Sequence, residues 1–155
     1  MPAAFVVAAV LAGALLASLG ACSGVQPAGT TLFRDVAPPP SASGRPDPVV
    51  KRSRFVEIDL TALRKPSTRF DLFPGTPPGA VTVVWSRVEQ PSAQSEAWVG
   101  HTGNEEVGSV TLVVNQAEGV VAATIHLAGG LYRIRYAGNG VHVIEELNSR
   151  AFPKD

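Results

Sequence analysis

Short runs of alternating apolar and polar residues, separated by Gly and Pro, constrain the fold of this chain more than any other feature. Successive side chains of a β-strand point to opposite faces, so this alternation is typical of a half-buried strand. The only helical signal is a single turn at 61–64, before Pro66. The pattern predicts eight strands, at residues 55–60, 69–73, 80–88, 96–101, 109–114, 120–127, 131–136 and 141–147.

The connections between these segments are short. Residues 116–119 form a loop of hairpin length, and Asn139-Gly140 is the strongest local hairpin signal in the chain. Strands joined by short loops usually pair with their neighbours in sequence. The sequence therefore predicts an all-β fold, an antiparallel meander of about 7–8 strands that forms a sandwich or a partly closed barrel.

The N-terminal residues predict export. Residues 3–21 are apolar and uncharged, as in the hydrophobic region of a signal peptide, which we place at 1–21. The run ends at Leu19-Gly20-Ala21-Cys22 and resembles the lipobox of bacterial lipoproteins, in which the cysteine is diacylated and becomes the first residue. We expect Cys22 to anchor the chain in the cell envelope, in the outer membrane if the cell has two, because Asp does not follow the cysteine. An uncleaved membrane anchor and an ordinary signal peptide with secretion are the alternatives.

The segment after Cys22 is rich in Pro, Gly, Ser and Ala. Such a composition buries too little apolar surface to offset the entropy of ordering, so we expect a lipidated flexible linker at 22–50. The short island at 31–34 could dock on the folded part. The β domain is expected at 51–155.

Composition and motifs exclude several functions. The chain has 13 basic and 13 acidic residues, which argues against nucleic-acid binding. The single cysteine supports neither an internal disulfide nor a Cys-based zinc site. The sequence contains no His-Glu-x-x-His, Gly-rich phosphate loop or Gly-x-Ser-x-Gly motif, so we expect no catalytic residue and no cofactor.

The three histidines lie in alternating strands. His126 and His142 alternate with apolar neighbours, which predicts solvent-facing rings, although the two could approach each other across a hairpin. A site formed by these two and His101 is conceivable, but no carboxylate has matching spacing, so we expect no metal. The adjacent pairs Glu105-Glu106 and Glu145-Glu146 point to opposite faces and are interpreted as solubility charges.

Aromatic residues are the remaining candidates for binding. The two tryptophans, together with Phe70, Phe73 and Tyr132, are expected to anchor the core or its rim rather than to form a stacking platform. A ligand-binding function would require a deep apolar pocket lined by Trp85 or Trp98. The candidate binding surface consists of Trp85, Trp98, Tyr132 and His142.

Several segments between residues 54 and 155 occur in a characteristic order, namely DLFP at 71–74, VWSRVE at 84–89, WVG at 98–100, SVTLVV at 109–114, LYRIRY at 131–136, GVHVIEEL at 140–147 and AFP at 151–153. Together they resemble the N-terminal region of secreted bacterial zinc metallopeptidases of the reprolysin-like, peptidyl-Asp type. The resemblance implies a pro-region that assists folding and masks an active site. The family's His-Glu-x-x-His-x-x-Gly-x-x-His motif is absent, so protease activity and zinc binding do not transfer and no catalytic residue is carried over. Masking would be steric, because residues 54–155 contain no cysteine.

Two functions follow as expectations. The first is a non-catalytic, membrane-tethered pro-region-like domain, either a folding aid or steric inhibitor of a metallopeptidase or a truncated remnant of one. The alternative is an envelope lipoprotein that binds a small ligand or a cell-wall component. A hydrolase with an unrecognised site is a third and weaker interpretation.

Overall fold

The computed structural model describes residues 32–40, 47–103 and 108–152. These residues form one nine-stranded antiparallel sheet in the order β1-β2-β9-β8-β7-β6-β5-β4-β3. Two 3-10 helices, η2 (Leu60–Arg64) and η3 (Ser149–Ala151), accompany the sheet. The strands are β1 (Phe33–Asp35), β2 (Val50–Ile58), β3 (Ser67–Asp71), β4 (Ala80–Ser92), β5 (Ser95–Thr102), β6 (Gly108–Asn115), β7 (Val120–Leu127), β8 (Gly130–Gly138) and β9 (Val141–Leu147).

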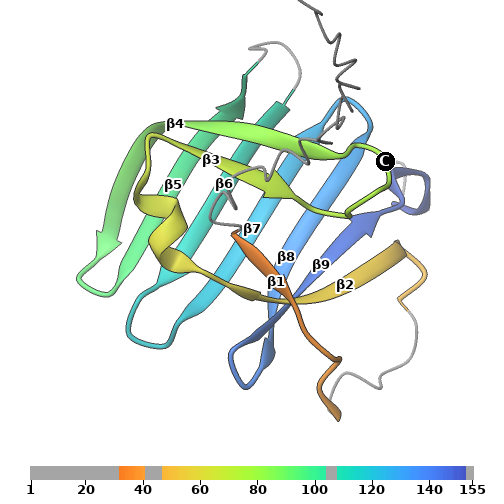
Figure 1. Cartoon of the computed structure of the whole chain (residues 1–155), viewed down its shortest axis with the longest axis horizontal. Coiled ribbons are helices and arrows are strands. Elements are labelled where there is room, and N and C mark those ends of the chain that lie inside the picture. Colours follow the sequence, from red (N-terminus) through yellow and green to blue (C-terminus); the bar gives the residue numbers. More distant parts are fainter. Residues whose placement is uncertain (1–31, 41–46, 104–107, 153–155) are drawn as a thin grey trace, which may run out of the picture.

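The sheet curls into a nearly closed barrel (Figure 1). From β3 to β9 each strand pairs with the next one in sequence, and β2 joins the far side of β9. The tight turn between β8 and β9 contains Asn139 and Gly140 with φ values of 54° and 76°, the left-handed pair that an Asn-Gly hairpin requires. The predicted all-β meander is therefore confirmed, as a partly closed barrel rather than a sandwich.

The first strand comes from the segment that was expected to be a flexible linker. Phe33 pairs with Ile58 of β2, and the side chain of Leu32, with 1% exposure, lies in the core. The prediction of a linker at 22–50 is thus wrong at β1, because these apolar side chains gain burial that offsets the cost of ordering. The signal peptide, Cys22 and the Glu105-Glu106 pair lie outside the described residues.

Alternation along each strand fills the barrel. In β6 the side chains of Val110, Leu112 and Val114 are buried while their neighbours are exposed, and β7 repeats this pattern. The inward residues form one cluster with the apolar residues of β1, β3 and η2. The largest fully buried side chains include Tyr132, Phe70, Leu32, Leu63, Leu72 and Leu112.

Side chains close the seam between the two edge strands, β1 and β3. The rings of Phe33 and Phe70 meet edge to face with their centroids 5.5 Å apart. Arg54 Nη1 donates to the carbonyl oxygens of Asp71 at 2.6 Å and Leu72 at 3.1 Å. An arginine of β2 thus satisfies main-chain acceptors where β3 ends.

The loop between β3 and β4 covers one end of the barrel. Arg52 lies 4.1 Å from the centroid of the Phe73 ring and donates to Thr76 Oγ1, to the Pro77 carbonyl and to Glu146 Oε2, each at 2.6 Å. Burial would raise the pKa of Glu146, but hydrogen bonds from Lys51 and Arg52 outweigh it and leave the pKa lowered. The guanidinium of Arg52 therefore links this loop to β9.

The adjacent Glu145 lies on the opposite face and is 3% exposed. Its carboxylate accepts hydrogen bonds from Arg133 and Arg135 of β8. The expectation that Glu145 and Glu146 are simple solubility charges is therefore wrong, although their placement on opposite faces is as predicted. Neighbouring arginines hold both carboxylates. No helix among the described residues is long and apolar enough to span a bilayer.

Candidate functional site

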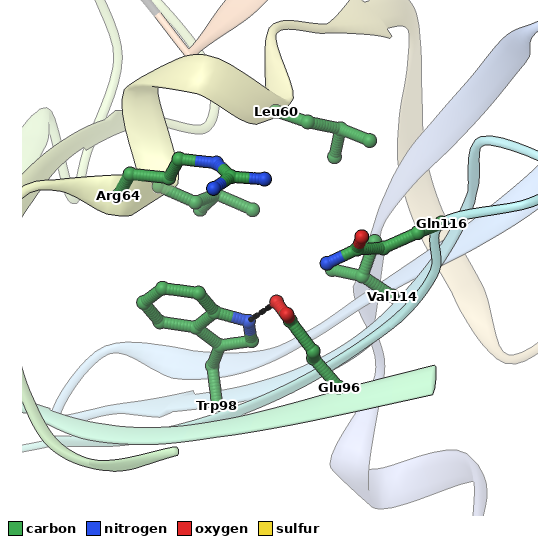
Figure 2. A pocket seen from close by; sticks show the side chains of 7 residues that line it. Leu60, Arg64, Glu96, Trp98, Val114 and Gln116 are labelled. Carbon is green, nitrogen blue, oxygen red and sulfur yellow. Dashed lines mark hydrogen bonds between the residues drawn. The ribbon is translucent and has the colours of Figure 1, made fainter. Parts of the chain in front are cut away.

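A pocket of about 220 Å³ lies between η2 and the ends of β5 and β6. Figure 2 shows the guanidinium of Arg64 on one side of this space and the indole of Trp98 on the other, with Glu96 and Gln116 at one end. The volume is below the range typical of drug-sized ligand sites, so the pocket suits a single ring or a short side chain. Its lining consists of Leu60, Leu63, Arg64, Glu96, Trp98, Val114 and Gln116.

Local capping and one tertiary hydrogen bond position η2. Asp59 Oδ1 accepts from the main-chain nitrogen of Thr61 at 2.9 Å and from its hydroxyl at 2.7 Å. Thr68 of β3 donates from Oγ1 to the carbonyl of Ala62 at 3.1 Å. With Leu63 buried beneath it, the turn presents Arg64 to the pocket. The helical turn predicted at 61–64 is confirmed.

The indole of Trp98 is held by its neighbours. The ring of Trp85 meets it edge to face with the centroids 5.5 Å apart, and Trp98 Nε1 donates to Glu96 Oε2 at 3.2 Å. Trp85 Nε1 donates in turn to Thr68 Oγ1 at 3.0 Å. A Cβ on Gly100 would lie 2.9 Å from Trp85 Cε3, so only glycine fits beneath the Trp85 ring. The two tryptophans are thus fixed by contacts from three strands.

Three polar side chains in the pocket have hydrogen-bonding capacity to spare. Neither the guanidinium of Arg64 nor the side-chain amide of Gln116, both on exposed residues, has a hydrogen bond or ion pair within the described part of the chain. Glu96 accepts only from Trp98 Nε1 there, which leaves its other carboxylate oxygen unused. A cation, an anion and a neutral amide therefore face one small space without satisfying each other.

The predicted binding surface does not come together as one site. Trp85 and Trp98 are in contact, but only Trp98 lines the pocket. Tyr132 lies in the core beneath the loop between β3 and β4, with its ring centroid 6.3 Å from that of Phe73. Burial, together with the charge of Glu146, raises the pKa of Tyr132. Its phenol is part of the packing rather than of a binding surface.

His142 faces the interior, so the prediction that its ring faces solvent is wrong. The residue is 2% exposed, and its Nε2 accepts the main-chain N–H of Val121 at 3.0 Å. The ladder between β7 and β8 stops at the pair Ala123 and Ile134, and the imidazole satisfies a main-chain donor beyond that point. Burial lowers the pKa of His142, an effect that the backbone of Gly140 opposes in part.

The other histidines are placed differently. His126 is exposed, as predicted, on the outward face of β7, and His101 is partly exposed on β5. His126 and His142 therefore do not converge, since one faces solvent and the other the interior. Across residues 32–40, 47–103 and 108–152, no three His, Cys, Asp or Glu side chains are grouped closely enough to hold a metal ion.

Sequence reasoning missed most of the pocket. The spacing of Glu96 and Trp98 places them on one strand face and was an available signal. Leu60 and Arg64 lie opposite that face because η2 packs there in the folded chain, and no local sequence pattern predicts this packing. Gln116 lies in the loop after β6, as predicted, but its place in the pocket lining was not predicted.

A second exposed feature is the free edge of β4. Strand β3 pairs only with residues 80–84, and the bond from the Trp85 nitrogen to the Pro66 carbonyl is the last one on that side. Residues 86–92 continue as a strand against β5, and all seven are exposed. This part of β4 bends down the left side of Figure 1, and no other strand of the described chain pairs with its outer edge.

Comparisons with known proteins identify no family. No protein-family model matches the sequence, and no curated protein matches it. A solved structure described as "Structure of a chaperone-substrate complex" is similar in fold, with a TM-score of 0.54 and 12% sequence identity. The match covers 68% of this chain and 92% of that chain. At this identity the likeness concerns the fold alone.

Proposed function

We propose that this chain is a non-catalytic, exported and membrane-tethered β domain that binds a metallopeptidase as a folding aid or steric inhibitor. The ordered segments between residues 54 and 155 that resemble a metallopeptidase pro-region support the choice of partner. The lipobox-like residues before Cys22 support tethering to the cell envelope. The same resemblance would hold for a remnant of such an enzyme, which would have the pro-region-like domain but no metallopeptidase to bind.

The free edge of β4 is the observation that carries this proposal. A strand with one open edge offers main-chain donors and acceptors to an extended segment of another protein, a common mode of peptide recognition. Val88, at 50% exposure, lies within the open stretch. Pro91 lacks an N–H and ends the useful edge, and Arg87 and Glu89 form an exposed ion pair beside Val88. Charge and proline at an edge limit self-association.

Partner capture tests the proposal. The full-length chain, purified in detergent and immobilised, is incubated with the envelope and secreted proteins of the same cell, and bound proteins are identified by mass spectrometry. We expect recovery of a zinc metallopeptidase, whose activity should fall when the chain is added.

A matched pair of variants locates the contact. Val88→Lys adds a charge to the free edge, whereas Val113→Lys adds the same charge at another exposed valine, 40% exposed, on the central strand β6. We expect Val88→Lys to lose the protease and Val113→Lys to keep it. Recovery of no protease, or equal recovery by both variants, would overturn binding through this edge.

The pocket favours a second candidate function, which is the binding of a small ligand or cell-wall component by an envelope lipoprotein. Trp98 lines this pocket, as that function requires, but the lining is mixed rather than purely apolar. Thermal unfolding of the full-length chain in the presence of envelope extracts tests this candidate. An increase in melting temperature that Arg64→Ala abolishes would support it, and an unchanged melting temperature would oppose it.

A further inference from the structure

We infer that the pocket between η2 and β5 binds a single saccharide ring, with Trp98 as its apolar platform and Arg64, Glu96 and Gln116 as its polar contacts. This inference rests on the second candidate function, ligand binding, and is independent of the free edge of β4.

The chemistry of the lining selects this class of ligand. A saccharide ring has an apolar C–H face that can pack on an indole, and a rim of hydroxyl groups that both donate and accept hydrogen bonds. Leu60, Leu63 and Val114 add apolar surface, whereas the guanidinium, carboxylate and amide require polar partners. A hydroxyl can donate to Glu96 and another can accept from Arg64, so one ring satisfies charges of opposite sign.

Other small ligands fit the lining less well. A fatty acyl chain would desolvate Glu96 and leave it without a new donor, which is costly for a charged group. A simple anion would pair with Arg64 but repel Glu96 and use none of the indole. A volume of about 220 Å³ limits the ligand to one ring, so a polymer would bind through its end or a branch.

The pocket is also built rather than incidental. Trp98 is held by Trp85 and Glu96, and the main chain of η2 is held by Asp59 and Thr68. The indole is therefore positioned before a ligand arrives and loses little entropy on binding, whereas the exposed side chains of Arg64 and Gln116 become ordered around the ligand.

Nuclear magnetic resonance of the full-length chain tests the inference, because its two tryptophans give two indole N–H signals. The Trp98 indole bonds Glu96 in the pocket, whereas the Trp85 indole bonds Thr68 away from the lining and serves as an internal reference. The signals are assigned with Trp85→Phe. The detergent is an amine oxide, because a glycoside detergent would itself present sugar. The probes are the methyl glycosides of glucose, N-acetylglucosamine and glucuronic acid.

We expect at least one glycoside to shift the Trp98 signal in a saturable manner and to leave the Trp85 signal nearly unchanged. Arg64→Ala should weaken binding by about tenfold or more, the usual effect of losing a hydrogen bond to a charged group, and Gln116→Ala by about two- to tenfold, the usual effect of losing a neutral one. Arg69→Ala and Gln90→Ala, which change exposed residues of the same types outside the lining, should not.

Octanoate and phenylalanine are titrated in parallel. If one of them shifts the Trp98 signal and no glycoside does, the pocket binds a ligand but the saccharide class is wrong. If no probe shifts the signal, both the saccharide inference and the ligand-binding candidate fail. Glycoside binding that Arg64→Ala and Gln116→Ala leave intact would place the sugar elsewhere and overturn the inference.

Discussion

The imidazole of His142 on β9 accepts the main-chain N–H of Val121 on β7, at 3.0 Å from Nε2. A side chain thereby reaches across β8 and satisfies a donor that the ladder between β7 and β8 leaves unpaired. Only the neutral imidazole can accept this bond, since both nitrogens of a protonated ring are donors.

Acid should therefore destabilise the fold through His142. Burial keeps the pKa of His142 below its ordinary value of 6.5, so the unfolded chain binds a proton more readily than the folded one. The contribution to stability is fully present above about pH 6.5 and is lost as the pH falls from there towards the folded-state pKa. Urea unfolding between pH 8 and pH 5 should show this loss.

His142→Phe should be less stable by about 1–3 kcal/mol at pH 8, because the Val121 donor stays unpaired, and should lack this part of the pH dependence. His126→Gln, at an exposed position, is the control, and a His142→Phe profile parallel to the wild type would contradict the prediction.

Replacement of Arg54 should loosen the barrel seam. Arg54→Lys keeps the positive charge but cannot reproduce the contacts to Asp35 Oδ1 and to the carbonyls of Asp71 and Leu72 together. We expect a loss of about 1–3 kcal/mol in the free energy of unfolding, with the pKa of Asp35 rising because the Arg54 hydrogen bond lowers it now. Arg34→Lys, in an exposed pair with Glu57, should change stability by less than about 0.5 kcal/mol. If Arg54→Lys lowers the free energy of unfolding as little as Arg34→Lys does, the seam depends on the positive charge of Arg54 rather than on the geometry of its hydrogen bonds.

Gly100→Ala should strain the contact between β4 and β5. The new Cβ would lie 2.7 Å from the carbonyl oxygen of Val84 and 2.9 Å from both Trp85 Cε3 and Val83 Cγ1, so main chain as well as side chains must move. Overpacking of this kind costs about 1–3 kcal/mol. The matched control is Gly129→Ala, whose Cβ would meet nothing within 4 Å. Thermal unfolding measures both, and a wild-type melting temperature for Gly100→Ala would show that the strands can separate at no cost.

Removal of the Glu145 carboxylate should cost more than removal of an exposed one. Glu145→Ala leaves Arg133 and Arg135 side by side without their shared partner and opens space at a buried position. Because both arginines are partly exposed, they can turn towards water, and we expect a loss of about 1–3 kcal/mol, less than for a fully buried pair. Glu57→Ala should stay within about 0.5 kcal/mol of the wild type. Chemical denaturation at low and high salt compares the two, and similar losses would contradict the argument.

The sequence predicted the strands that alternate and failed where burial departs from alternation. Residues of β6 and β7 are buried at every second position, so pattern and face agree. In β9, His142, Val143, Ile144 and Glu145 are all buried, and alternation there cannot tell which face is inside. Strand β1 has only three residues, too few for a period to be visible.

The candidate site was even less accessible to sequence reasoning. Trp98 was identified from its residue type. Gln116 directly follows β6, which pairs with β5, whereas Arg64 reaches the pocket only through the placement of η2 against the sheet. Contacts of this kind depend on the path of the whole chain rather than on any local period.

If the chain is lipidated as we propose, the early start of β1 limits how far the domain can lie from the bilayer. If Cys22 carries the lipid, only the stretch between Cys22 and Leu32 separates the anchor from the first core residue, instead of a linker that reaches residue 50. Ten residues span at most about 35 Å even when fully extended. With the lipid in place, the barrel would stay within a thin layer above the membrane, and a partner or ligand would have to come within that layer to be bound.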